Sequence, residues 1–324
     1  MRRAFSFTGF GMLCLLCSSA LAACRSAERQ SVSSSLRMHR VRVEGGELRL
    51  WERAPLRKER NITFLLVHGM TWSARPAFDL EGAGQERSLM RAFARRGYRS
   101  FALDQRGYGA SPRDVSGWLS PAQAAEDLRH TVHVVREKRR DDLFVLLGWS
   151  RGSMVAALAA QDRSVPVDIL VLYAYPVSPS KRYAPESSCR LPPRRKTHEK
   201  DARSDFILPH RVSPRVVDAF VAQALQADPV RVDWWHLDEF NALRPEALWL
   251  PTLVVSGERD PLARPAFQAE LMARLSAPDR AWVLLGESAH AAHLEEGQEE
   301  FLQAIESFLA RRRAPSTCFV SASP

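Results

Sequence analysis

The chain has 324 residues, of which 45% are hydrophobic and 26% charged, so it can form one large globular domain or two small ones. Its 16 glycines and 20 prolines are too few for a collagen-like or low-complexity protein. The formal net charge of +9 is compatible with a nucleic-acid or anionic-lipid partner, because net charge governs association rather than fold. No zinc-binding spacing, basic heptad helix or aromatic RNA-binding motif accompanies this charge, and we therefore expect no nucleic-acid partner.

The first 23 residues are expected to be a signal peptide rather than part of the fold. Arg2 and Arg3 form a short positive region, and the apolar run that follows carries no charge. This run ends in Leu-Ala-Ala-Cys, residues 21–24, which resembles the lipobox of bacterial lipoproteins and implies lipidation of Cys24. The sequence thus predicts an exported protein of the bacterial cell envelope, held to a membrane by an N-terminal lipid anchor.

Other interpretations of this segment stay open. The protein is secreted without a lipid if Cys24 is not modified. Residues 4–24 are also long enough to span a bilayer as an uncleaved anchor, although serine, threonine and glycine dilute the run. The pair Arg2-Arg3 is similar to the start of a twin-arginine export signal.

The elements after the signal peptide alternate between strand and helix patterns. Residues 36–43 and 47–54 alternate apolar and polar side chains around Gly45-Gly46, which predicts a β-hairpin. Short continuous apolar runs, typical of strands buried on both faces, occupy residues 64–67, 101–103, 143–147, 169–172, 253–255 and 282–285. Helices are expected at residues 88–96, 120–140, 153–161, 214–227, 234–243, 265–275 and 295–312. This alternation predicts an α/β fold with a mostly parallel sheet and helices on both faces.

The order of these elements also predicts the domain organisation. Residues 24–35 are rich in serine and arginine and are expected to be a flexible tether. The core comprises residues 36–176 and 249–313, because the buried-strand runs fall only there. Residues 177–248 contain proline, arginine and helical patterns instead, which indicates an inserted helical cap. Residues 314–324 are expected to be a tail.

Two cysteines lie in the mature chain beyond the lipidation site, at positions 189 and 318. They can form a disulfide in an oxidising compartment or remain as free thiols, and the sequence leaves both states open. Neither cysteine has a metal-ligand spacing, so we expect no metal site from them.

A G-x-S-x-G motif, residues 148–152, follows the apolar run that ends at Leu147 and precedes an alanine-rich helical pattern. The chain must turn sharply at such a junction, and glycines on each side relieve the crowding that lets Ser150 project above the sheet. Serine is a weak nucleophile at neutral pH. It needs a histidine to take its proton and a carboxylate to orient that histidine.

The remaining two groups follow the last two predicted strands. Asp260 comes after the next-to-last strand and His290 after the last one, and both are expected at the same sheet edge as Ser150. Glu258 lies nearer its strand and is the alternative acid. His293 is the alternative base.

Five motifs in this order resemble the capped α/β-hydrolases that have the triad order Ser, Asp, His. They are His68-Gly69, Asp-Gln-Arg-Gly-Tyr-Gly-Ala-Ser at 104–111, the serine motif at 148–152, Gly-Glu-Arg-Asp at 257–260, and His290 followed by Glu295. The resemblance extends from about residue 41 to residue 309. It implies a mostly parallel eight-stranded sheet with an inserted helical cap.

The resemblance also assigns roles to individual residues. It implies that Ser150 is the nucleophile, Asp260 the orienting acid and His290 the base. The backbone N–H groups of Met70 and Arg151 are the implied oxyanion hole, which holds the negative oxygen of the tetrahedral intermediate. No metal and no cofactor are implied.

A serine in the G-x-S-x-G turn limits the reactions that we expect of this fold. Haloalkane dehalogenases and epoxide hydrolases of this fold use aspartate at that position, which argues against both reactions. We expect a serine hydrolase that cleaves a small or medium-sized carboxylic ester through an acyl-enzyme on Ser150, with a small-molecule acyl substrate as its partner. Lactone, thioester, amide and C–C bond hydrolysis belong to the same fold.

Two alternatives are less favoured by the sequence. A proline-type peptidase typically needs acidic cap residues for the amine of its substrate, but the cap is basic over residues 190–200, with Glu186 and Glu199 as its few nearby acids. The alternative from another class is a non-catalytic envelope lipoprotein on an inactive hydrolase fold.

Overall fold

The computed structural model of the chain describes residues 1, 35–83, 87–186 and 191–313. The expected signal peptide beyond Met1, the lipidation site Cys24, the tether up to residue 34 and the tail lie outside the described residues, as do Cys189 and Cys318. No helix within the described ranges is long and apolar enough to cross a membrane.

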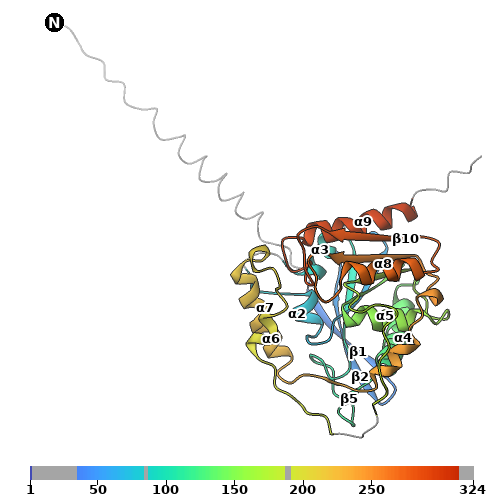
Figure 1. The fold of residues 1–324 in the computed structure, drawn as a ribbon. Coiled ribbons are helices and arrows are strands. Elements are labelled where there is room, and N and C mark those ends of the chain that lie inside the picture. The colour runs from blue at the N-terminus through green and yellow to red at the C-terminus, as the bar shows by residue number, and fades with distance from the viewer. Residues whose placement is uncertain (2–34, 84–86, 187–190, 314–324) are drawn as a thin grey trace, which may run out of the picture. The chain divides into compact units, whose positions relative to one another are not determined.

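An eight-stranded sheet forms the centre of the fold (Figure 1). Its strands are β1 (Leu36–Val43), β2 (Gly46–Arg53), β3 (Ile62–Val67), β4 (Arg99–Asp104), β6 (Leu143–Trp149), β7 (Ile169–Tyr173), β9 (Thr252–Gly257) and β10 (Arg280–Leu285). They lie in the order β1-β2-β4-β3-β6-β7-β9-β10. The hairpin β1–β2 and the pair β2–β4 are antiparallel, and all the other neighbours are parallel. The predicted mostly parallel sheet is confirmed.

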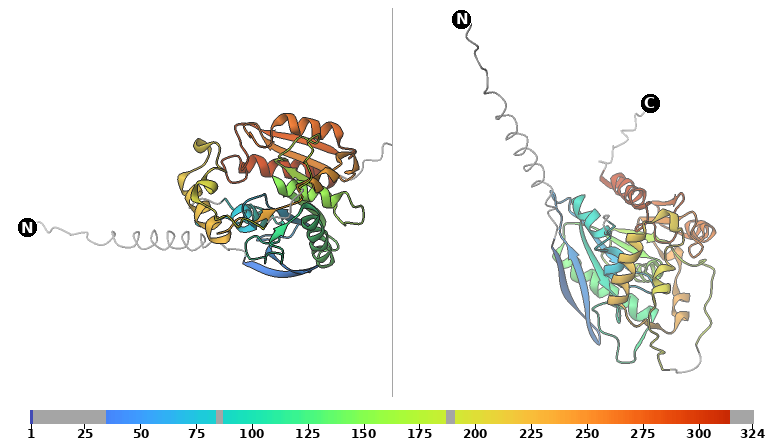
Figure 2. Two further views of the ribbon diagram at one scale, coloured as in Figure 1. Left: turned by 60° about the horizontal axis from the view of Figure 1, so that its bottom comes forward. Right: turned by 90° about the vertical axis from the view of Figure 1, so that its left-hand side faces the viewer.

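The strand order reverses direction at β3, because β4 lies on one side of it and β6 on the other. In open parallel sheets, ligands bind beyond the carboxyl ends of the strands at such a reversal. The segments that leave β3 and β6 are the ones that begin with His68 and Ser150. Figures 1 and 2 show β1 and β2 in blue at one edge of the sheet, with β10 in red at the other.

Helices cover both faces of the sheet. They are α2 (Ala74–Phe78), α3 (Leu89–Arg95), α4 (Pro121–Lys138), α5 (Arg151–Ala160), α6 (Glu199–Arg203), α7 (Pro214–Ala227), α8 (Pro265–Arg274) and α9 (Gln298–Arg313). Alternate residues of β3 face opposite layers: Phe64 and Leu66 belong to the core under α2, α3 and α9, and Leu65 and Val67 to the core under α4, α5 and α8. Burial on both faces explains why the strands are continuous apolar runs.

Serine N-caps begin α3 and α4, at the starts expected for the helices 88–96 and 120–140. The Ser120 hydroxyl accepts the backbone N–H of Gln123 at 3.3 Å, and Pro121 follows in the first turn of α4. The Ser88 hydroxyl accepts the N–H of Arg91 at 3.0 Å and begins α3. Helix α9 begins at residue 298, three positions later than expected.

The prediction of a helix at residues 234–243 is wrong. This stretch contains the short strand β8 (Asp233–Trp234) and the 3-10 helix η2 (Leu237–Ala242). Strand β8 pairs in parallel with β5 (Trp118–Leu119), and His236 adopts a left-handed backbone with φ of 54°. The pairing with β5 and the left-handed residue prevent a continuous α-helix here.

The residues expected to form the cap, 177–248, contain α6, α7, β8 and three 3-10 helices, η1 (Pro209–Arg211), η2 and η3 (Pro245–Ala247). Helix α7 lies against α2 of the core (Figure 1). The β5–β8 pair joins this region to the segment that precedes α4.

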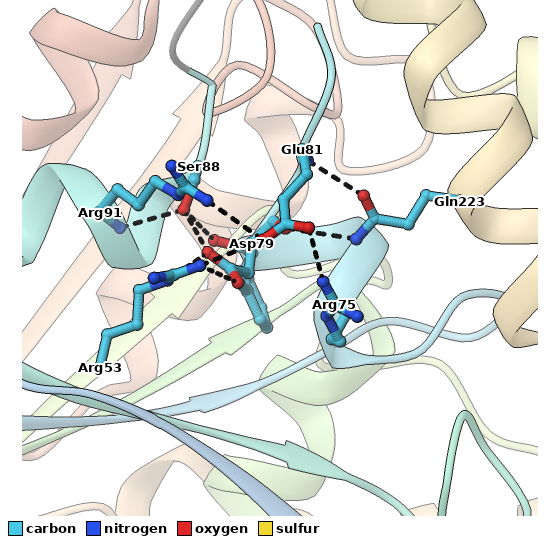
Figure 3. Close-up of polar contacts among 8 residues, drawn as sticks. Arg53, Arg75, Asp79, Glu81, Ser88, Arg91 and Gln223 are labelled. Carbon is cyan, nitrogen blue, oxygen red and sulfur yellow. Dashed lines mark hydrogen bonds and ion pairs between the residues drawn. The ribbon is translucent and has the colours of Figure 1, made fainter. Parts of the chain in front are cut away.

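A buried ion pair fixes the position of α2 (Figure 3). The Arg53 guanidinium on β2 donates two hydrogen bonds to the Asp79 carboxylate, at 2.7 and 2.8 Å, and both side chains are buried. The Ser88 hydroxyl donates a further one to Asp79 at 2.6 Å. From α7, the Gln223 amide donates to the Asp79 carbonyl at 3.2 Å and accepts the N–H of Glu81 at 3.0 Å. The network therefore links β2, the segment after α2 and helix α7.

Candidate active site

Ser150 occupies a strained turn between β6 and α5. Its φ and ψ are 55° and −126°, in a region that residues with a Cβ rarely adopt. Such a conformation costs about 1–3 kcal/mol and persists only where the surroundings hold it. Here the Ser150 N–H donates to the carbonyl of Tyr173 on the neighbouring strand at 2.9 Å.

The two glycines of the motif are required by close backbone contacts. A Cβ on Gly148 would lie 2.3 Å from the carbonyl oxygen of Gly152. A Cβ on Gly152 would lie 2.3 Å from the carbonyl oxygen of Val67 at the end of β3. Any side chain at either position would therefore push the turn out of shape, which explains the spacing of the motif.

His290 and Asp260 form a buried pair. The His290 Nδ1 lies 2.7 Å from the Asp260 Oδ2. The other carboxylate oxygen accepts the backbone N–H groups of Leu262 and Ala263, at 2.8 and 3.0 Å, so the carboxylate has little freedom to turn. The carboxylate orients the ring through Nδ1 and leaves Nε2 for proton transfer.

The backbone next to His290 is also anchored. Its carbonyl accepts hydrogen bonds from the Trp149 indole N–H at 2.8 Å and from the Tyr173 hydroxyl at 3.1 Å. Trp149 is the last residue of β6, directly before Ser150, and Tyr173 is the last residue of the neighbouring strand β7. The histidine segment is therefore positioned by the strand that precedes the serine and by its neighbour.

A cavity of about 70 Å³ is lined by Ser150, His290 and Met70, among other residues. The segment that leaves β3 lies directly against the serine, because a Cβ on Gly69 would be 3.2 Å from the Ser150 Cβ. The structure thus brings the predicted nucleophile, base and oxyanion segment to one cavity. Asp260 reaches it through His290.

The two expected oxyanion donors are the backbone N–H groups of Met70 and Arg151, on the segments that follow β3 and β6. Among the described residues, the Met70 N–H has no hydrogen-bond partner. The Arg151 N–H is in the first turn of α5, where backbone donors lack an acceptor within the helix. The described residues thus give neither N–H group a hydrogen-bond acceptor.

Tyr108 fixes the Met70 peptide, a role that the sequence analysis did not foresee. Its hydroxyl donates to the Met70 carbonyl and accepts the Trp234 indole N–H at 2.8 Å. The tyrosine is buried and its ring packs edge-on against His68, with 4.5 Å between the ring centroids. This side chain therefore connects the segment after β3 with β8 in the expected cap.

His68 joins two core segments and takes no position in the cavity. Its Nε2 accepts the backbone N–H of Gln105 at 3.1 Å, and its Nδ1 donates to the Gly69 carbonyl at 3.0 Å. Burial lowers the pKa of His68 to about 4, and the bond to the Gly69 carbonyl opposes this shift only in part. The ring is neutral at physiological pH.

The alternative base and acid lie outside the cavity. His293 Nε2 donates to the Ala77 carbonyl at 2.8 Å and its Nδ1 lies 3.2 Å from the Tyr173 hydroxyl, so both ring nitrogens are engaged. Burial lowers the pKa of His293 to about 3. Glu258 is exposed and its carboxylate accepts the N–H of Glu287 at 3.2 Å.

Asp205 is an acidic residue of the cavity that the sequence analysis missed. It lies between α6 and η1, lines the same cavity as Ser150 and His290, and accepts the Trp72 indole N–H at 2.5 Å. Burial raises the pKa of Asp205 to about 6, while the nearby His290 and the Trp72 bond act in the opposite direction. No motif or spacing in the sequence marks this aspartate.

Comparisons with known proteins identify the family and the fold. A family model described as serine aminopeptidase, S33, matches residues 59–297. No curated protein sequence matches the chain.

Solved structures share the fold at low sequence identity. An esterase from Thermogutta terrifontis with malate bound is 21% identical, with a TM-score of 0.59 over 85% of this chain and 98% of the other. An esterase from Pyrococcus furiosus is 16% identical, with a TM-score of 0.56 over 86% and 91%. A membrane phospholipase A described as a bacterial virulence factor is 21% identical, with a TM-score of 0.57 over 94% of each chain. Together with the family match, they confirm the α/β-hydrolase fold.

Proposed function

Because this chain belongs to the serine aminopeptidase family S33 and is an α/β-hydrolase enzyme, we propose that it cleaves a small or medium-sized carboxylic ester through an acyl-enzyme on Ser150. The observation that carries this proposal is the 2.7 Å contact between His290 and Asp260, beside a cavity that Ser150 also lines. A serine hydroxyl becomes a useful nucleophile only when an oriented base accepts its proton.

In the first half of the reaction, the Ser150 Oγ attacks the ester carbonyl carbon while His290 Nε2 takes the hydroxyl proton. The carbonyl oxygen becomes negative and accepts hydrogen bonds from the N–H groups of Met70 and Arg151. Loss of one such donor costs roughly 100-fold or more in rate. The intermediate then breaks its C–O bond, and the alcohol leaves with the proton from His290.

In the second half, water replaces the alcohol. His290 Nε2 takes a proton from water, and the hydroxide oxygen attacks the acyl carbon on Ser150. The second tetrahedral intermediate expels the serine oxygen, which recovers its proton from His290. Asp260 stabilises the transient imidazolium through its contact with Nδ1.

A fluorophosphonate probe tests this function. It should label the wild type and the Ser164→Ala variant, in which an exposed serine after α5 is changed, but not Ser150→Ala. Folded wild-type protein that remains unlabelled at neutral and mildly alkaline pH would contradict the proposal.

Asp205 favours a second candidate function, the removal of an N-terminal residue from a peptide. A carboxylate beside Ser150 and His290 can pair with the ammonium of a peptide N terminus, and such a pair would stabilise the ionised form of Asp205. If Asp205 binds this ammonium, Asp205→Asn should slow the hydrolysis of an aminoacyl p-nitroanilide more than the hydrolysis of an acetyl ester. The ratio of the two rates should therefore fall. An unchanged ratio removes this candidate.

For the N-terminal segment, we propose export and attachment to a membrane of the cell envelope through lipid on Cys24. The support is the position of Leu-Ala-Ala-Cys at the end of the uncharged run. Labelled palmitate should be incorporated by the wild type and by Cys17→Ser, but not by Cys24→Ser. Equal incorporation in all three proteins would contradict the lipid anchor.

A further inference from the structure

A second and larger cavity adjoins the catalytic one. It measures about 700 Å³ and shares Met70 with the cavity that Ser150 lines. Arg151, the residue after the candidate nucleophile, lines it from the core, and Arg231 and Trp234 line it from the cap segment. A group bound at the Met70 and Arg151 end of this larger cavity therefore lies beside the segments that flank Ser150.

The Arg151 guanidinium is held in this cavity by an aromatic ring. Its Cζ lies 5.0 Å from the centroid of the Trp234 ring. The Trp234 indole is fixed in turn by its hydrogen bond to the Tyr108 hydroxyl. Among the described residues, no carboxylate forms an ion pair with Arg151, in contrast to the buried Arg53–Asp79 pair.

Arg231 presents a second cation to the same cavity. The described part of the chain gives it no ion pair, and its main chain is held by bonds to Arg195 and Arg113, at 2.8 Å each. Burial lowers the pKa of Arg151, and the charge of Arg231 acts in the same direction, whereas Tyr108 and Tyr183 act against it. Two like charges that line one cavity favour the binding of an anion between them.

The lining of the cavity carries more cationic than acidic side chains. Asp233 and Glu186 also line it. The Asp233 carboxylate accepts the backbone N–H of Arg194 at 3.0 Å. Within the described ranges, neither acid forms an ion pair with Arg151 or Arg231, and the exposed Arg195 adds a third cation at the rim.

We propose that Arg151 and Arg231 form an anion-binding subsite, and that the substrate is an acyl compound that carries an oxyanion such as a carboxylate. Guanidinium groups bind carboxylate and phosphate oxygens through paired, charge-assisted hydrogen bonds. The Trp234 ring supplies a flat apolar wall beside this anion. The inference rests on the proposed serine hydrolase function and specifies its substrate class.

Matched ester pairs test the subsite in the full chain. Mono-p-nitrophenyl glutarate and p-nitrophenyl pentanoate differ by a carboxylate on the acyl side, and 4-acetoxybenzoate and phenyl acetate by a carboxylate on the alcohol side. The wild type should prefer the anionic member of at least one pair in kcat/KM. High salt should reduce this preference, because it screens partly exposed charges.

Substitutions of Arg231 test whether the preference for the anionic ester depends on this arginine. Arg231→Gln should lower the anionic-to-neutral ratio about tenfold or more, mostly through KM, because a charge-assisted hydrogen bond is lost. Arg231→Lys should retain part of the preference. Arg215→Gln removes an exposed arginine on α7 outside both cavities and should leave the ratio unchanged.

Two results overturn the inference while the proposed function stands. One is a wild type that reacts with fluorophosphonate but prefers neither anionic ester, and the other is a preference that survives in Arg231→Gln. Calorimetry with the Ser150→Ala variant tests the subsite without turnover. It should detect binding of glutarate or of inorganic phosphate that Arg231→Gln weakens, and the absence of binding for both anions counts against the subsite.

Discussion

The Tyr108 hydroxyl donates a hydrogen bond to the Met70 carbonyl and so fixes the peptide that follows His68-Gly69. The same hydroxyl accepts the indole N–H of Trp234, on which the Arg151 guanidinium lies. One buried side chain thus connects the expected oxyanion segment with the proposed anion subsite. The position of Met70 therefore depends on the cap segment as well as on the core.

This relationship predicts the effect of Tyr108→Phe. Loss of the hydroxyl frees the Met70 peptide, so kcat for ester hydrolysis should fall about tenfold while KM changes less, because an oxyanion donor acts mainly in the transition state. Tyr98→Phe is the matched control, since it removes a hydroxyl that is bonded to Glu306 far along the chain at 2.9 Å. It should lower stability without changing kcat. Equal kcat values for the two variants would show that the Tyr108 bond has no catalytic role.

The turn at Ser150 predicts an asymmetry among glycine substitutions. Gly152→Ala places a Cβ 2.3 Å from the Val67 carbonyl oxygen and should abolish labelling by fluorophosphonate, through displacement of the serine or loss of the fold. Gly286→Ala meets no atom within 4 Å and should leave labelling and melting temperature nearly unchanged. Normal labelling of a folded Gly152→Ala protein would show that the turn tolerates displacement.

The ion pair of Figure 3 predicts a large loss of stability. Asp79→Asn removes the closer counter-ion of the buried Arg53 guanidinium, which keeps only the half-exposed Glu81 at 3.3 Å, and should cost about 3–5 kcal/mol of unfolding free energy. Glu246→Gln removes an exposed partner of Arg274 and should cost less than about 1 kcal/mol. Denaturant unfolding monitored by circular dichroism measures both values. Similar losses in the two variants would contradict this difference between a buried and an exposed pair.

The buried histidines predict how stability depends on pH. The pKa of His293 is lowered from its usual 6.5 to about 3, so below pH 6.5 the unfolded chain binds a proton there that the folded protein does not. Its contribution to stability is present above pH 6.5 and is lost as the pH falls toward 3. His68, with a pKa of about 4, acts with the same sign.

Asp104 and Asp205 act with the opposite sign, since burial raises the pKa of each to about 6 and the folded protein binds their protons first. The histidine effect is therefore measured as a difference between proteins. Between pH 6 and 4, His293→Asn should change the slope of unfolding free energy against pH by up to about 1.4 kcal/mol per pH unit relative to the wild type. Parallel curves for the two proteins would mean that His293 is not held neutral.

The central strands β3, β6, β7 and β9 could be predicted from the sequence because they are buried on both faces and so appear as continuous apolar runs. The starts of α3 and α4 could also be predicted, because the signals that begin a helix are local in sequence. The helix expected at 234–243 does not form, since the backbone there is set by the pairing of β8 with β5, more than one hundred residues away. Propensity cannot report such a tertiary contact.

In the candidate site, too, some positions could be predicted from the sequence and others depend on tertiary contacts. Ser150, Asp260 and His290 each follow a strand, and the strand ends meet at one edge of a parallel sheet, so their proximity can be expected from spacing alone. Asp205 and Arg231 reach the cavities from irregular segments within residues 177–248, which have no periodic pattern there. Their positions depend on how those segments pack on the core, which the sequence pattern does not encode.

The assignment of the base is tested most directly by the hydrolysis of p-nitrophenyl esters in two histidine variants. His290 contacts Asp260 and lines the cavity with Ser150, whereas both ring nitrogens of His293 are engaged elsewhere. The account predicts that His290→Ala abolishes turnover, while folded His293→Ala retains it at reduced stability. Retained turnover in His290→Ala together with its loss in folded His293→Ala would contradict the account.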